Sequence, residues 1–553
     1  MEKLVLTKNK LTAIKKSLVN GLTVASGSKT SATYYHSKDE QVKAIQKHVK
    51  DLYEVSKELP LIVAAQKGVT GAYATEVLLN ELNETYSGGA CNIVNPKDWY
   101  DEGVGEKALL SVLNNLDSNG ITYVLRFFME VKNRKINNER TRKIVLGYLW
   151  GLNNLEFFAV KYRNKIFEVL QHIYGKRTTS ILLSIAEKSN TGDGVVTTSK
   201  ESDIVEKYLM RYSVFNTEKT FKILLFLFKK DEGIEYSATE FPIISQYMKA
   251  KQDVTNISLV PEEILIGLLS DENHPQYNQL WSTEEKRKST MATLRKNVAV
   301  TSVNQQVRQT KSTQKLGVEK TVDLSKATDF LALYKTGYEN GFTEEILDAI
   351  DKLAEKKKFN NFMYETIGII FDKSRSMYGH KQQSKNTPIS IADFTMKVLG
   401  KSAKKWIVQF SDTGFNTDLA TAFVELMKAE RDLEKESNAV FVDGDDFGGK
   451  FDAIFVLTDG YENSYEGLFS EVVDAYLTQT NRTLPIFQIS PITGAETGAD
   501  VRKIGDSVFN ISVNDPVVIK PQIDAKLLEI DTTLWIENQM KFFKALPLKR
   551  YKK

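Results

Sequence analysis

The segment that decides the fold of the C-terminal third reads Ile367-Gly368-Ile369-Ile370-Phe371-Asp372-Lys373-Ser374-Arg375-Ser376-Met377. An apolar run of strand length ends abruptly in Asp-x-Ser-x-Ser, so one carboxylate and two hydroxyls follow the expected strand on a short loop. These groups are hard oxygen ligands, which suit Mg²⁺ or Mn²⁺ better than zinc. The segment therefore predicts a divalent-cation site at the carboxyl end of a buried strand.

From about residue 362 onward, strand-like runs alternate with helix-like runs. The expected strands cover residues 366–371, 405–410, 453–457, 484–489 and 507–512. The expected helices lie between them, at residues 391–400, 419–430 and 468–479. This alternation predicts a mostly parallel, doubly wound α/β sheet with right-handed crossovers.

Loops that carry oxygen donors follow three of the expected strands. The first loop carries Asp372, Ser374 and Ser376, the second spans residues 411–418, and the third reads Thr458-Asp459-Gly460. In a doubly wound sheet, ligands gather at the carboxyl ends of the strands, near the topological switch point. Asp and Ser are also common in ordinary turns, so it is the succession of three such loops that favours a metal site.

The first two thirds of the chain show a helical period instead. From about residue 38 to residue 356, apolar residues recur three and four positions apart with charged residues between them. No strict sequence repeat accompanies the pattern. A long run of helices without strands predicts an all-α solenoid of stacked helical pairs.

The bulk composition limits the class of protein. A chain of 553 residues is too long for one core, which predicts two or three domains. The formal net charge is only +3, so an anionic partner must meet a local patch. The single cysteine, Cys91, excludes an internal disulfide and a Cys-based zinc site. Because no apolar stretch approaches membrane-spanning length and the N-terminus lacks a secretion-signal pattern, we expect a soluble, cytoplasmic protein. We also expect a monomer.

The three donor loops resemble the von Willebrand factor type A domain and its metal-ion-dependent adhesion site. The resemblance implies metal ligands at Asp372, Ser374, Ser376, Thr417 and Asp459. The second loop is short between its strand and Thr417, so Thr413 is a competing ligand. Lys373 and Arg375 place positive charge beside the site, which would weaken cation binding by repulsion or attract an anionic partner.

A domain of this type after a long helical array resembles the TROVE family of Ro-type ribonucleoproteins. Three parts of the chain carry the resemblance: Gly27-Ser28-Lys29-Thr30-Ser31-Ala32-Thr33-Tyr34-Tyr35, Met291-Ala292-Thr293-Leu294-Arg295-Lys296-Asn297, and Leu331-Ala332-Leu333-Tyr334-Lys335-Thr336-Gly337 with the helical pattern at 344–349. The resemblance implies that residues 1–360 form a HEAT-like helical ring that binds RNA. It further implies a von Willebrand A domain at 361–530, which leaves residues 531–553 as a basic tail.

In this family the ring binds small structured non-coding RNA on its outer basic surface and single-stranded 3′ ends of misfolded RNA through its central hole. Lys and Arg bind phosphates, and polar or aromatic surfaces hold unpaired bases. Basic clusters offer the candidate RNA-binding residues Arg142, Lys143, Arg163, Lys165, Lys176, Arg177, Arg295 and Lys296. The same clusters are also what ordinary solvated helix faces look like.

No catalytic constellation stands out, because the chain has no Walker-type glycine loop, no Gly-x-Ser-x-Gly and no His-Glu-x-x-His. Asp452, Asp459 and Glu462 lie close together in sequence at one expected strand end, where they could hold two metals for phosphodiester cleavage. Three functions compete: an RNA-binding scaffold or quality-control factor that recruits a protein such as an RNA-processing nuclease through the metal, a protein-interaction scaffold without RNA, and a metal-dependent nuclease. We expect the first, and no enzyme activity.

Overall fold

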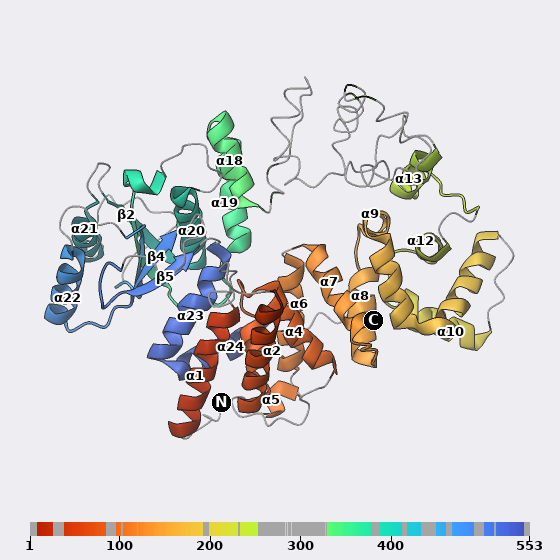
Figure 1. The fold of residues 1–553 in the computed structure, drawn as a ribbon, viewed down its shortest axis with the longest axis horizontal. Helices are drawn as coiled ribbons and strands as arrows, with labels where there is room; N and C mark the ends of the chain where they lie inside the picture. Colours follow the sequence, from red (N-terminus) through yellow and green to blue (C-terminus); the bar gives the residue numbers. More distant parts are fainter. Residues whose placement is uncertain are drawn as a thin grey trace. The chain divides into compact units, whose positions relative to one another are not determined.

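The structure is a computed structural model. It describes residues 8–25, 38–83, 96–100, 103–118, 120–191, 198–229, 233–252, 329–378, 387–411, 417–432, 450–460, 467–491, 503–513 and 516–546, with single residues at 283, 285, 289, 324 and 327. The chain divides into two compact units. Unit 1 comprises Met1–Leu78, Tyr86–Asn115 and Leu324–Pro547, and unit 2 comprises Leu79–Thr85, Leu116–Asp323 and Leu548–Lys553. Figure 1 shows helices through most of the described chain and one sheet in its C-terminal part.

Unit 1 contains a five-stranded sheet in which all neighbouring strands are parallel, in the order β2-β1-β3-β4-β5. The strands are β1 (Thr366–Phe371), β2 (Lys405–Phe410), β3 (Ala453–Leu457), β4 (Ile486–Pro491) and β5 (Phe509–Val513). The first three have the predicted bounds, and the last two begin two residues later than predicted. The strand order reverses between β1 and β3, so the topological switch point lies there.

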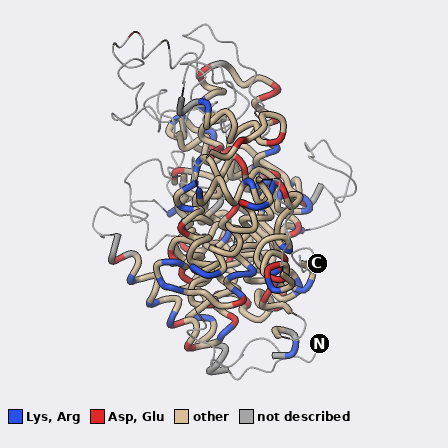
Figure 2. Tube along the Cα trace, turned by 90° about the vertical axis from the view of Figure 1, so that its right-hand side faces the viewer, with Lys and Arg blue, Asp and Glu red and all other residues tan. Residues whose placement is uncertain are grey.

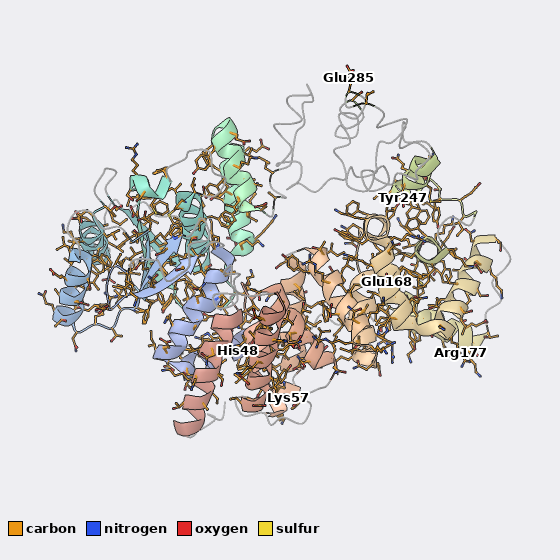
Figure 3. All side chains as sticks on the ribbon, in the orientation of Figure 1. His48, Lys57, Glu168, Arg177, Tyr247 and Glu285 are labelled. Atoms are coloured by element: carbon orange, nitrogen blue, oxygen red, sulfur yellow. The ribbon has the colours of Figure 1, made fainter. Side chains whose placement is uncertain are left out.

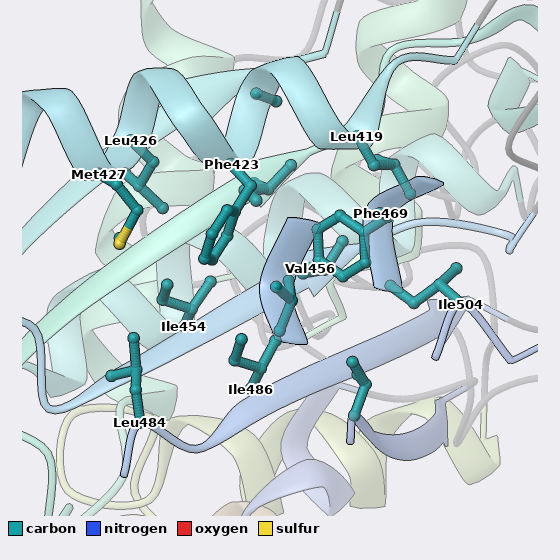
Figure 4. Packing of buried hydrophobic residues seen from close by; sticks show 14 of the residues in the cluster. Leu419, Phe423, Leu426, Met427, Ile454, Val456, Phe469, Leu484, Ile486 and Ile504 are labelled. Carbon is teal, nitrogen blue, oxygen red and sulfur yellow. The ribbon is translucent and has the colours of Figure 1, made fainter. Parts of the chain in front are cut away.

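Helices α21 (Leu419–Asp432) and α22 (Leu468–Thr480) bury their apolar sides against one face of the sheet. Figure 4 shows Phe423 and Phe469 packed over Ile454 and Val456 of β3. Gly368 of β1 permits the close approach of α21, because a Cβ there would lie 2.7 Å from a δ-carbon of Leu426. Helices α20 (Pro388–Ser402) and α23 (Ile519–Ile530) pack on β1 and β4 and on β5 respectively.

Unit 1 also holds the first helices of the chain. They are α1 (Lys8–Ala25), α2 (Lys38–Val55), α3 (Leu59–Ala64), α4 (Gly71–Asn83), α5 (Pro96–Tyr100) and α6 (Val104–Ser118); α4 and α6 each continue past the unit's boundary. Helix α1 packs against α23 and α2, so the first described helix meets a helix from near the end of the described chain in this unit. Helices α18 (Phe330–Asn340) and α19 (Glu344–Lys357) lead into β1.

The predicted basic tail at 531–553 is wrong for the residues that the structure describes. Residues Thr532–Ala545 form α24, and the side chains of Trp535 and Phe543 are fully buried. The lysines at the end of the chain follow a helix with buried apolar residues. The last residues, 547–553, lie outside the described part.

A buried polar seam joins α3, α23 and α24. The Lys520 ammonium donates to Gln66 Oε1 at 2.7 Å and pairs with Asp524, and Gln66 Nε2 donates to Gln539 Oε1 at 2.8 Å. All four side chains are at most 3% exposed. Buried charges require partners of this kind because their desolvation is costly.

The regular structure of unit 2 consists of helices in its described residues. Its helices are α7 (Ile121–Asn133), α8 (Glu139–Trp150), α9 (Leu155–Lys161), α10 (Arg163–Thr191), α11 (Ser199–Val205), the π-helix η1 (Glu206–Met210), α12 (Thr217–Lys229) and α13 (Pro242–Gln252). Helix α10 packs on α7 and α12 and is interrupted at Gly175, which has φ 71°. No helix among the described residues is long and apolar enough to cross a membrane.

The expected all-helical first part and doubly wound second part are therefore both present in the described residues. The two units follow a different division from the expected boundary at 360, because the N-terminal helices lie in the same unit as the sheet. Hydrophobic periodicity reveals that a helix has an apolar face, but it does not reveal which neighbour covers that face.

Candidate metal site and nucleic-acid interface

Asp372 directly follows β1 and is fully buried. Its Oδ1 accepts hydrogen bonds from the backbone N–H of Ser374 at 2.8 Å and from Ser411 Oγ at 3.3 Å. Its Oδ2 accepts a hydrogen bond from Thr458 Oγ1 at 2.7 Å. The carboxylate therefore lies at the switch point, held by loops that follow β1, β2 and β3.

The two serines of the first loop lie together beside this carboxylate. Ser374 is buried and Ser376 is exposed, and their hydroxyl oxygens are 2.9 Å apart. A short 3₁₀ turn, η5 (Arg375–Tyr378), carries Ser376 back toward Ser374 and buries Met377 beneath the loop. The Asp-x-Ser-x-Ser spacing thus brings its three side chains to one place, as predicted.

The second loop contributes a buried threonine just before α21. Thr417 is fully buried. Asp418, the next residue, caps α21 by accepting hydrogen bonds from the Thr421 backbone N–H and hydroxyl. The competing ligand, Thr413, lies outside the described residues.

Asp459 follows β3 and is half-buried. Burial raises the pKa of the Asp372 carboxyl, and hydrogen bonds from Ser374 and Thr458 act to lower it. The negative charge of Asp459 also acts to raise the pKa of Asp372, which places the two carboxylates within electrostatic reach of each other. Two neighbouring carboxylates at the end of adjacent strands would favour a cation between them.

The sequence-based set did not include Ser411 and Thr458, which both donate to Asp372. Ser411 additionally accepts a hydrogen bond from the Lys373 backbone N–H, and Thr458 accepts one from that of Gly460. Both hydroxyls follow a strand directly, as Asp372 follows β1. That shared position is the signal that could have identified them.

The donors described above fit a hard divalent cation. Among the described residues, the side-chain groups named above around the Asp372 carboxylate are oxygens, from two carboxylates and several hydroxyls, and they come from three loops. In the described part of the chain, no three His, Cys, Asp or Glu side chains gather as a metal-binding group. The candidate site around Asp372 differs from such a group, because it combines two carboxylates with several hydroxyls.

Lys373 has an aromatic partner. Its Nζ lies 3.5 Å from the centroid of the Phe410 ring, at the end of the neighbouring edge strand β2. The ring face attracts the ammonium group. Phe410 remains 43% exposed.

Of the three residues named for a two-metal nuclease site, the two that the structure describes, Asp452 and Asp459, do not lie together. Asp452 precedes β3, where its Oδ2 accepts from the backbone N–H groups of Glu365 and Thr366 at 2.9 and 2.8 Å. Asp459 follows β3, so the whole strand separates them by on the order of 15 Å or more. Paired catalytic metals lie about 4 Å apart, and Glu462 is outside the described residues.

The candidate RNA-binding residues are placed in different ways. Lys165, Lys176 and Arg177 are exposed on α10, and Figure 3 labels Arg177 there. Arg295 and Lys296 lie outside the described residues. Across the described chain, Lys and Arg positions are interspersed with Asp and Glu along the backbone (Figure 2).

The Arg163 side chain is half-buried and makes contacts within the protein, unlike the exposed basic side chains of α10. Its Nε donates to the Phe226 carbonyl at 2.8 Å, and its guanidinium lies 5.3 Å from the centroid of the Phe226 ring. The side chain therefore ties α10 to α12. A half-buried arginine with these contacts is a poor candidate for a phosphate ligand.

Arg142 and Lys143 of α8 belong to a basic group that also includes Lys207 and Arg211 of the η1 region. We call these four residues the α8–η1 patch. The hydrogen bond and charge of Lys143 lower the pKa of the exposed Glu139, and the charges of Lys207 and Arg142 act in the same direction. Lys143, Lys207 and Arg211 are exposed.

Aromatic residues support this patch. Tyr212 is half-buried, and its neighbours Arg211, Lys143 and Arg142 interact with it electrostatically. Tyr208 packs edge-on against Tyr174, whose hydroxyl accepts a hydrogen bond from Trp150 Nε1 at 2.8 Å. The sequence-based candidates did not include Lys207 and Arg211. The dipeptides Lys207-Tyr208 and Arg211-Tyr212 are four residues apart, and this spacing indicates a helix side with both basic and aromatic residues.

Of three comparisons with known proteins, the one with solved structures gives a match. A scan against protein-family models finds no match, and a search of curated proteins finds none either. Among solved structures, the chain is similar to the crystal structure of the Deinococcus radiodurans RO (RSR) protein, with 11% sequence identity, 78% of this chain and 92% of that chain covered, and a TM-score of 0.28. Identity and TM-score this low leave the fold to be established by the chain's own elements.

Proposed function

We propose that this protein is an RNA-binding scaffold that acts on small structured non-coding RNA and on misfolded RNA with single-stranded 3′ ends. The observation that carries the proposal is the α8–η1 patch of unit 2, whose four cations act electrostatically on Glu139 or Tyr212 and whose Lys207 ammonium lies 5.7 Å from the centroid of the Tyr208 ring. Phosphates supply most of the affinity of such surfaces, and tyrosines offer faces on which unpaired bases stack.

The π-helical turn supports this reading. The backbone N–H of Arg211 donates to the Glu206 carbonyl, five residues earlier, at 3.0 Å. Such turns are rare and occur frequently at functional sites. Here the turn places Lys207 and Arg211 beside the first turn of α8, which brings basic residues that are far apart in sequence onto one surface.

The finer architecture that goes with this function is a closed ring of HEAT-like helices. Within unit 1, α1 contacts α23, which joins the first described helix to one near the end of the described chain. The Lys15 ammonium donates to the Glu529 carbonyl at 2.5 Å, and Lys107 donates to the Lys544 carbonyl at 2.8 Å. These contacts link N-terminal helices to α23 and α24.

The experiment for RNA binding is a filter-binding salt series with a structured RNA that carries a single-stranded 3′ tail. The test variant is Lys207→Gln with Arg211→Gln, and the matched control is Lys404→Gln with Lys428→Gln, which removes two exposed cations from the sheet region. Because each phosphate contact contributes about 0.7–0.9 to the salt slope, the test variant should lower the slope by about 1.4–1.8. Equal slopes for both variants would remove the patch from the proposal, and no binding by the unaltered protein at low salt would refute RNA binding itself.

We further propose that Asp372, Ser374, Ser376, Thr417 and Asp459 hold Mg²⁺, with Mn²⁺ as an alternative. The bound cation would supply an electrophilic position for an acidic side chain of a protein partner, such as an RNA-processing nuclease. This chain's residues orient the site, because Ser411 and Thr458 fix the Asp372 carboxylate by hydrogen bonds.

The metal proposal is tested by titrating Mn²⁺ and following the free ion by electron paramagnetic resonance. The unaltered protein should bind one Mn²⁺ that Mg²⁺ displaces, and Asp372→Asn should abolish this binding. Asp452→Asn, a carboxylate at the opposite end of β3, is the matched control and should bind as the unaltered protein does. Equal binding by Asp372→Asn and the control would place the cation elsewhere.

A protein-interaction scaffold that acts without RNA remains the second candidate. The observation that favours it is that the candidate metal residues lie in unit 1 and the α8–η1 patch lies in unit 2. Recruitment through the metal could therefore persist when RNA binding is absent. Loss of Mn²⁺ binding in Asp372→Asn with RNA affinity unchanged would show that the two properties are separable.

A further inference from the structure

Lys67 lies in the connection between α3 and α4 and is half-buried. Its ammonium donates to the carbonyl of Lys358 at 2.7 Å, in a hydrogen bond that is open to solvent. Lys358 is the residue at which α19 ends. The side chain of Lys67 therefore reaches from the first helices of unit 1 to the end of α19, where basic residues follow one another.

Several cations crowd this amine. Lys357 is the last residue of α19 and Lys358 is its C-cap, and the Lys520 ammonium is bound to the side chain of Gln66, the residue before Lys67. The acidic groups that face the cluster have partners of their own. Glu355 pairs with Lys358, and Asp524 pairs with Lys520.

The chemistry of an amine in such surroundings is altered. Burial lowers the pKa of Lys67 to about 8, and the charges of Lys357, Lys358 and Lys520 act in the same direction, against the opposing charge of Glu355. At pH 7 about one in ten such amines is neutral, against about three in ten thousand for an ordinary lysine. A neutral amine has a free electron pair, and lysines are activated as nucleophiles by desolvation or by a neighbouring cation.

We propose that Lys67 is a site of acylation, at which its side-chain amine reacts with activated acyl compounds of the acyl phosphate class. The nitrogen electron pair attacks the acyl carbonyl carbon, and a C–N bond forms. The bond between the acyl carbon and the phosphate oxygen breaks, and the phosphate leaves with the electron pair of that bond. The amine proton passes to water. The product amide keeps one N–H to donate to the Lys358 carbonyl but loses the positive charge. Acylation therefore removes one cation from the crowded group without removing its hydrogen bond.

The test is the rate at which individual lysines of the full chain are acetylated by acetyl phosphate, read by mass spectrometry of peptides between pH 6 and pH 11. Lys404, whose side chain is 71% exposed, is the internal reference. A weakly basic amine is also a weaker nucleophile, and with a Brønsted slope of about 0.5, as for thiols, the advantage of Lys67 at pH 7 is on the order of tenfold. Its rate should level off near pH 8, whereas that of Lys404 continues to rise.

Two substitutions on α19 separate the effect of charge crowding from simple accessibility. Lys357→Gln removes a facing cation and should slow acetylation of Lys67 at pH 7 several-fold. Lys352→Gln, an exposed lysine on the same helix, is the matched control and should leave the rate unchanged. Acetylation of Lys67 no faster than that of Lys404, or equal rates in the two variants, would overturn the proposal.

Discussion

The buried pair of Lys520 and Asp524 gives a prediction whose magnitude can be worked out. Lys520→Met keeps the length of an unbranched side chain and removes the ammonium. Asp524, which is 2% exposed, then loses its cation, and Gln66 Oε1 loses a donor. Removing one partner of a buried ion pair, so that the other charge stays unpaired, lowers the stability by about 3–5 kcal/mol. The unsatisfied amide oxygen of Gln66 adds about 1 kcal/mol to this loss.

The orphaned carboxylate can reduce this cost by taking up a proton. Protonation costs about 1.36 kcal/mol for each unit by which the pKa lies below the pH. The loss caused by Lys520→Met should therefore be smaller at pH 5 than at pH 7, by at most about 2.7 kcal/mol for the two units. The double variant Lys520→Met with Asp524→Leu replaces both charges and should regain most of the lost stability, because an apolar pair of similar volume is often as stable as a buried ion pair.

Hydrogen exchange of peptides from α23 measures the free energy of opening at this seam. The predicted order of stability is unaltered protein, then double variant, then Lys520→Met. The reasoning fails if Lys520→Met costs less than about 1 kcal/mol, or if the double variant is no more stable than the single one.

Three further predictions concern other parts of the chain. Gly368→Ala should cost about 1–3 kcal/mol in urea denaturation, because the added Cβ would lie 2.7 Å from Leu426; an unchanged midpoint would contradict the close packing of α21 on β1. The pKa of Lys67 is lowered from 10.5 to about 8 in the folded protein. Between pH 8 and pH 10.5 the unfolded chain therefore holds a proton on Lys67 that the folded chain lacks, so the free energy of unfolding rises with pH in this range. After a discount for solvent exposure the rise is about 1 kcal/mol, and it should vanish in denaturation of Lys67→Gln; an equal rise in both proteins would contradict it. Arg163→Gln should destabilise unit 2 by about 1–3 kcal/mol, because the Phe226 carbonyl loses its donor, and it should leave the salt slope of RNA binding unchanged; a lower slope would assign Arg163 to the RNA surface.

Local sequence patterns predicted the strands well because the signal was strong there. The apolar runs that form β1, β2 and β3 are each bounded by polar residues, so their bounds matched the structure. The convergence of Asp372, Ser374 and Ser376 also followed from the sequence, because parallel strands bring the loops at their carboxyl ends to one edge.

Properties that depend on tertiary contacts could not be predicted in the same way. Arg163 has the same local appearance as the exposed Lys165, and only the packing of α10 on α12 reveals its contact with Phe226. The nuclease alternative likewise rested on nearness in sequence. Asp452 and Asp459 are seven positions apart, but a strand between them carries them to opposite edges of the sheet.

Photo-cross-linking of bound RNA tests the central claim most directly. A structured RNA with a single-stranded 3′ tail, substituted with 4-thiouridine, is bound to the full chain, irradiated and digested, and the cross-linked peptides are identified by mass spectrometry. The account predicts cross-links in peptides from the start of α8 and from residues 206–212, where the two tyrosines lie among the cations of the α8–η1 patch. Cross-links confined to unit 1, or none at a protein concentration that retains the RNA, would contradict it.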